Sequence, residues 1–166
     1  MERTAVYRRA LAPTSLLAGG VGILAAAVGW LLGLNATGAF AGFWMAVAAV
    51  AAAGALGLMR RQALRDAEPF WSPPARRVVQ AMVPALAAGA VVGLLAVLPS
   101  GREAMPTWWL PPIWMILYGC ALHAAGFFMP RGIRLLGWVF VLLGCALLAL
   151  LTGCRQAPGL PGALLG

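Results

Sequence analysis

Five long apolar runs, separated by short polar segments, limit what this chain can fold into more than any other feature of its sequence. About 20 helical residues, at 1.5 Å per residue, cross the roughly 30 Å hydrocarbon core of a bilayer, and each run is close to that length. The runs cover residues 14–34, 38–59, 78–98, 110–129 and 133–151. We therefore predict an all-α integral membrane bundle of about five transmembrane helices, in a single domain over residues 14–152.

Composition agrees with a membrane location. Hydrophobic residues make up 63% of the 166 residues and charged residues only 10%, against about 45–50% and 25% in soluble proteins. A soluble fold of this size has too much surface for its volume to hide so many apolar side chains. A bilayer removes the conflict because it solvates the outward faces.

The distribution of arginine predicts the orientation. The side that holds the N-terminus, the second loop and the fourth loop carries ten arginines: Arg3, Arg8, Arg9, Arg60, Arg61, Arg65, Arg76, Arg77, Arg131 and Arg134. The other side carries Arg102 and Arg155. The positive-inside rule then places the amphipathic N-terminus, residues 1–13, in the cytoplasm and the flexible tail, residues 153–166, outside. Twelve basic residues that are all arginine, with abundant Ala, Gly and Pro, indicate a bacterial inner-membrane protein.

The cytoplasmic loop 60–77 is the most basic segment. Its arginines lie between apolar runs, which favours contact with lipid headgroups or a partner protein and argues against nucleic acid binding. Aromatic and proline residues beside them are typical of an anchor at the membrane surface. We predict headgroup or partner contacts, including contacts with anionic lipid, at Arg60, Arg61, Arg65, Trp71, Arg76 and Arg77.

Polar residues inside the apolar runs are few, and no run contains Asp, Glu or Lys. His123 in the fourth run is the main candidate for a binding residue, with Tyr118 nearby and Gln80 in the third run. Three interpretations of His123 stay open: a neutral side chain bonded to a neighbouring helix, a proton-relay or substrate contact, or a haem or metal ligand. A bis-histidine haem needs a second histidine, and the chain has one.

No nucleophile–base pair, phosphate-binding loop or C-x-x-C pair occurs in the sequence. We therefore predict no catalytic residues, no metal ligands and no cofactor.

Small residues at four-residue spacing occur throughout the first three runs, and such stripes let helices approach closely in lipid. They predict contacts among these three runs. The connection of residues 35–37 is so short that the first two runs must form an antiparallel hairpin. The fifth run is rich in leucine, with Gly137 and Gly144 one heptad apart, and we expect it to be peripheral and to face lipid.

Two segments resemble a group of small bacterial multi-pass inner-membrane proteins to which no activity is assigned. One is the loop with Glu68-Pro69-Phe70-Trp71-Ser72-Pro73-Pro74 between arginine pairs, and the other runs from Leu110-Pro111-Pro112 through His123 to Pro130-Arg131-Gly132. The resemblance extends over most of the chain. It implies location and transfers no catalytic residue.

These observations leave three hypotheses of function. The first is a non-enzymatic accessory, assembly or signalling subunit of a membrane complex that packs on other membrane proteins or on copies of itself. The second is a small oligomeric transporter or pore that uses His123 and Tyr118. The third is a membrane haem or redox protein.

Overall fold

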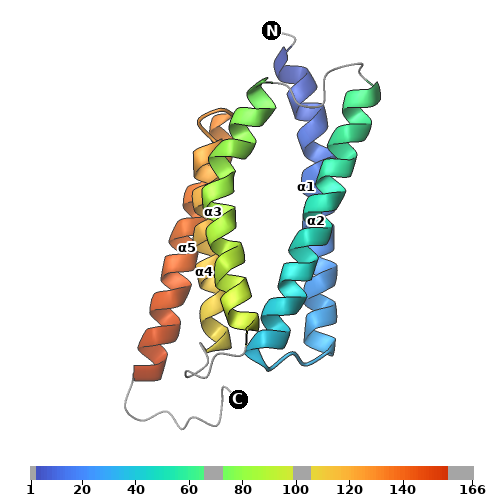
Figure 1. The fold of residues 1–166 in the computed structure, drawn as a ribbon. Helices are drawn as coiled ribbons and strands as arrows, with labels where there is room; N and C mark the ends of the chain where they lie inside the picture. Colours follow the sequence, from blue (N-terminus) through green and yellow to red (C-terminus); the bar gives the residue numbers. More distant parts are fainter. Residues whose placement is uncertain (1–2, 66–72, 99–105, 157–166) are drawn as a thin grey trace. The chain divides into compact units, whose positions relative to one another are not determined.

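A computed structural model describes the backbone of residues 3–65, 73–98 and 106–156. Side chains are described for residues 16, 17, 19–61, 63–65, 75–98 and 106–154. Within these ranges the chain forms five α-helices and one short 3₁₀ turn, which confirms the all-α prediction (Figure 1). The elements are α1 (Arg3–Leu31), α2 (Thr37–Arg65), α3 (Pro73–Val97), η1 (Thr107–Trp109), α4 (Leu110–Ala125) and α5 (Arg131–Gln156).

Three helical segments are long and apolar enough to cross a membrane: Thr37–Arg65, Ala75–Val97 and Arg131–Cys154. Within the described side chains, α1 contributes a shorter apolar helix, Gly19–Leu31. Helix α4 has 16 residues, which corresponds to about 24 Å, less than the roughly 30 Å of a hydrocarbon core. Membrane crossing stays a prediction for all five helices, and length and composition support it for α2, α3 and α5.

The chain divides into two compact units, each considered by itself. Unit 1 contains residues 1–76 and 93–104, and unit 2 contains residues 77–92 and 105–166. Helix α3 contributes to both.

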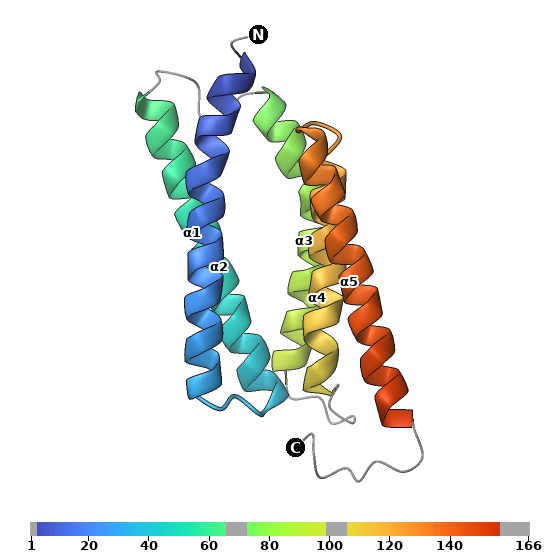
Figure 2. The same ribbon diagram turned by 180° about the vertical axis from the view of Figure 1, so that it is seen from behind.

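In unit 1, α1 and α2 form an antiparallel hairpin, as the short connection predicted (Figures 1 and 2). Helix α1 ends at Leu31, and Gly33 just beyond it has φ +58°. This left-handed conformation is accessible to glycine and is a common way to end a helix. The chain then turns, and α2 begins at Thr37.

Glycines on one helix of the hairpin accept larger side chains of the other. A Cβ atom placed on Gly54 would lie 3.2 Å from Leu17, and one on Gly29 would lie 3.2 Å from Phe43. At the start of α2, a Cβ on Gly38 would lie 3.6 Å from the carbonyl oxygen of Ala96 in α3. The predicted small-residue contacts are therefore present between α1 and α2, whereas α3 meets α2 only through its last turn, within unit 1.

In unit 2, α4 and α5 form a second hairpin, with closer packing than the first (Figures 1 and 2). Two prolines lie in the first turn of α4. Proline is tolerated there because N–H groups in the first turn have no hydrogen-bond partner within the helix. Helix α4 ends at Ala125, with Gly126 as its C-cap, and α5 begins at Arg131 after Pro130. The turn between them is residues 126–130.

Four glycines bring α4 and α5 together: Gly119 in α4 and Gly126 at its C-cap, and Gly137 and Gly144 in α5, each pair seven residues apart. A Cβ on Gly119 would lie 2.7 Å from the Gly137 carbonyl oxygen, and a Cβ on Gly137 would lie 2.6 Å from the His123 nitrogen. A Cβ on Gly126 would lie 2.6 Å from Arg134, and one on Gly144 would lie 2.8 Å from Ile116. Any side chain at these positions would force the backbones apart.

The expectation that the fifth apolar run is only peripheral is therefore wrong for one of its faces. Gly137 and Gly144 are buried against α4. The opposite side agrees with the expectation, because Leu135, Leu142 and Leu150 remain 62–65% exposed. Helix α5 thus has one packed face and one open apolar face.

Candidate functional site

His123 lies two residues before the end of α4, on the face that meets α5. The absence of a side chain at Gly137 lets the two backbones approach at this point. The position of the histidine is therefore fixed by close packing between two apolar helices.

The imidazole of His123 contacts two aromatic rings. Its centroid lies 5.4 Å from that of Phe127 and 5.3 Å from that of Trp138, both with nearly perpendicular ring planes. Such edge-to-face contacts are favourable between aromatic rings. Phe127 comes from the α4–α5 turn, and Trp138 comes from α5.

The Nδ1 atom of His123 is buried and has no hydrogen-bond partner among the described residues. A buried polar atom without a partner costs free energy, about 1–3 kcal/mol. One interpretation of His123 requires a hydrogen bond to a neighbouring helix. The Nδ1 atom does not form such a bond with the described residues.

The other two candidate binding residues do not join His123 in one site. The ring of Tyr118 packs on Phe140 at 5.5 Å, and Tyr118 is 44% exposed. Gln80 lies exposed on α3. In the described part of the chain, no hydrogen bond connects His123, Tyr118 and Gln80.

Sequence reasoning missed a hydrogen bond between α4 and α3. The indole N–H of Trp114 donates to the carbonyl oxygen of Gly89 at 3.0 Å. Gly89 has no side chain to shield its carbonyl, and a Cβ placed there would lie 3.8 Å from the indole. The small residues at four-residue spacing in the third apolar run indicated close packing of a helix. They did not indicate which helix, or which side chain of it, would contact them.

The predicted headgroup-contact residues lie at helix ends. Arg60, Arg61 and Arg65 are exposed in the last turns of α2, and Arg76 and Arg77 are exposed near the start of α3. Trp71 lies outside the described residues.

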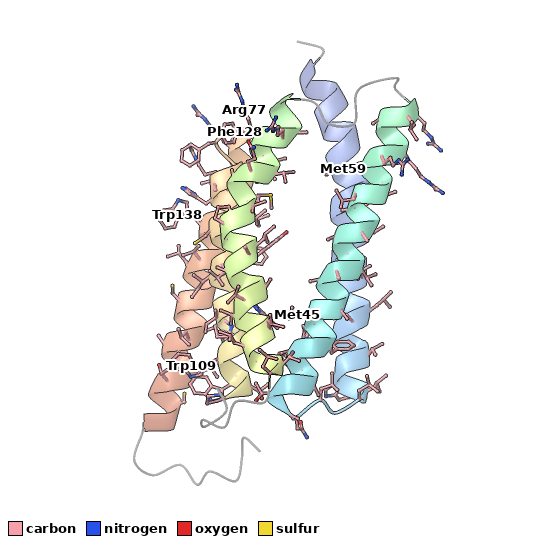
Figure 3. The ribbon with its side chains drawn as sticks, in the orientation of Figure 1. Met45, Met59, Arg77, Trp109, Phe128 and Trp138 are labelled. Carbon is pink, nitrogen blue, oxygen red and sulfur yellow. The ribbon has the colours of Figure 1, made fainter. Side chains whose placement is uncertain are left out.

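A second group of arginines lies around the α4–α5 turn. The sequence predicted only the side of the membrane on which these arginines lie. The guanidinium carbon of Arg134 lies 5.6 Å from the centre of the Phe127 ring, within the range of a cation–π contact. Arg131 is exposed at the start of α5. Figure 3 shows Arg77 and Phe128 at the same end of unit 2.

The described residues contain no group of three or more His, Cys, Asp or Glu side chains that could hold a metal ion. Cys120, Cys145 and Cys154 are exposed free thiols. The four acidic residues Glu2, Asp66, Glu68 and Glu103 all lie in segments whose side chains are not described.

No family model matches the chain, and no curated protein or solved structure matches it either. The resemblance to small bacterial membrane proteins gains no support from these comparisons. Function must therefore be inferred from the residues and their arrangement.

Proposed function

We propose that the chain is a multi-pass protein of the bacterial inner membrane, with its N-terminus in the cytoplasm, and that it is a non-enzymatic accessory, assembly or signalling subunit of a membrane complex. Three apolar helices of sufficient length support the membrane location. The observation that carries the subunit role is a group of uncovered glycines in α1: Gly19, Gly20 and Gly22.

These three glycines lower the stability of α1 unless another helix packs against them. A glycine inside a helix is less favourable than alanine by roughly 0.5–1 kcal/mol. Among the residues that the structure describes, a Cβ atom at any of the three would meet no atom within 4 Å, and the neighbouring Leu16 and Ile23 are 76% and 74% exposed. In unit 2 of the same chain, comparable glycines are covered by a partner helix. A helix of another membrane protein, or of a second copy, is the occupant that fits a glycine face in lipid.

Co-purification in mild detergent tests the subunit role. We expect the tagged wild-type chain to retain a membrane protein partner or to form an oligomer, and the double variant G19L/G22L to lose it. The matched control is G132L/G153L, because a Cβ atom added at Gly132 or Gly153 also meets no atom of the described residues within 4 Å. A wild-type chain that runs as a lone monomer without any membrane partner would contradict the proposal.

A small oligomeric transporter or pore is the second candidate function, and one observation favours it. The buried Nδ1 of His123 has no partner in the described residues, and ionisable groups inside membranes often mark the paths of protons or substrates. Flux across liposomes that is the same for wild type and His123→Ala would remove this candidate.

A haem protein is tested in the same preparation, since purified protein without visible absorbance would exclude it.

A further inference from the structure

We propose that the α4–α5 turn binds the phosphate headgroup of an anionic phospholipid, and that the open face of α5 receives one of its acyl chains. The turn site consists of Phe127, Phe128, Arg131 and Arg134, with Arg77 at the same end of unit 2. The inference rests on the proposed membrane location and is independent of the subunit role.

Arg134 is held in place at this site. A Cβ on Gly126 would lie 2.6 Å from the Cβ of Arg134 and 2.7 Å from its Cα, so the end of α4 packs directly on this residue. Its guanidinium group lies over the Phe127 ring at 5.6 Å. A cation–π contact uses none of the guanidinium N–H groups as hydrogen-bond donors to oxygen, so they can donate to phosphate oxygens.

The charge of unit 2 favours an anion from outside it. The sequence of this unit, residues 77–92 and 105–166, contains Arg77, Arg131, Arg134 and Arg155 but no Asp or Glu. No side-chain carboxylate of unit 2 can therefore neutralise the arginines of the turn site. Basic residues at the membrane surface attract anionic lipids.

The surroundings of the turn fit a lipid better than a soluble anion. Phe127 and Phe128 are 65% and 52% exposed. Leu135, Trp138 and Leu142, at spacings of three and four residues, share one side of α5 and are 51–64% exposed. Figure 3 shows Trp138 on α5 near the labelled Phe128. A continuous apolar strip thus leads away from the arginines.

The length of α4 brings the turn near the phosphates. Sixteen residues span about 24 Å, and a bilayer adapts to a short span by local thinning or by long flanking side chains that reach the interface. Both responses place headgroups close to Arg131 and Arg134.

Native mass spectrometry of delipidated protein tests the site. Phosphatidylglycerol is titrated into the wild type and the variant R131Q/R134Q, with phosphatidylcholine and inorganic phosphate as separate arms. Each arginine at an anionic lipid surface contributes about fivefold in affinity, so we expect the dissociation constant for phosphatidylglycerol to rise at least about tenfold in the variant. Wild-type protein should discriminate against phosphatidylcholine and bind no inorganic phosphate.

The control R102Q/R155Q removes the same charge at the two arginines predicted outside, and we expect it to bind phosphatidylglycerol like wild type. R131K/R134K keeps the charge but loses the planar guanidinium groups, so we expect its affinity for phosphatidylglycerol to lie between those of the wild type and R131Q/R134Q. Equal loss in R102Q/R155Q, or unchanged binding in R131Q/R134Q, would overturn the proposal. Failure of the membrane location would instead be seen beforehand, as protein that remains soluble after ultracentrifugation without detergent.

Discussion

Single glycines determine where the helices of this protein meet. Gly137 is the clearest case, because the His123 backbone occupies the space that a side chain at Gly137 would need. Lipid tails give apolar helices no hydrophobic reason to associate, so close backbone packing and interhelical hydrogen bonds must hold them together. Changes at such residues should affect stability more than changes at the larger exposed side chains.

Gly137→Ala tests this packing. A Cβ at this position would lie 2.6 Å from the His123 nitrogen, which is backbone and cannot move independently. Overpacking of this kind typically costs about 1–3 kcal/mol, and we expect a loss of that size in the free energy of unfolding measured by SDS titration. In the control Gly153→Ala the added Cβ meets none of the described atoms within 4 Å, and this change should leave stability unchanged or raise it by up to about 1 kcal/mol. Equal effects at the two positions would contradict the packing.

Trp114→Phe tests the hydrogen bond between α4 and α3. The change removes the indole donor to Gly89 but keeps an aromatic ring. Interhelical hydrogen bonds in membrane proteins average about 0.6 kcal/mol, so we expect a small loss of stability in the same titration. Trp30 is 83% exposed, and Trp30→Phe should cause no comparable loss. A larger loss in Trp30→Phe would argue against this hydrogen bond.

At the scale of the elements, the sequence predicted the helices well and their pairing only in part. Apolar length indicated the helices, and the short connection at residues 35–37 predicted the first hairpin. The closest pair, α4 and α5, was not predicted, because Gly and Ala occur in every run and spacing alone does not select a face. The relevant signal was the same seven-residue spacing of glycine in both: Gly119 in α4 and Gly126 at its C-cap, and Gly137 and Gly144 in α5.

The first hairpin can be tested with two glycines of α2 that lie three residues apart. A Cβ on Gly54 would lie 3.2 Å from Leu17 of α1, whereas one on Gly57 would meet no atom within 4 Å in the part of the chain whose side chains are described. We expect Gly54→Leu to destabilise the purified protein by about 1–3 kcal/mol through overpacking and Gly57→Leu to have little effect. The reverse order would show that α2 presents a different face to α1.

At the scale of the whole molecule, the sequence predicts which helix ends carry arginines. It does not predict how these residues come together to form a site. The number of arginines in each segment predicts that the end of α2 and the α4–α5 turn lie on the same side of a membrane. The cation–π contact of Arg134 with Phe127 and the edge-to-face contact of His123 with Trp138 depend on how α4 and α5 are paired. Residues that lie on different helices could not be brought together before that pairing was known.

The central claim is that the apolar runs cross a bilayer about five times with the N-terminus in the cytoplasm. Dual reporter fusions in a bacterial host test it most directly, with the reporter placed after Asn35, Asp66, Arg102, Pro130 and Arg155. We predict external signals after Asn35, Arg102 and Arg155, and cytoplasmic signals after Asp66 and Pro130. A cytoplasmic signal after Arg155, or the same signal at two successive positions, would contradict the claim.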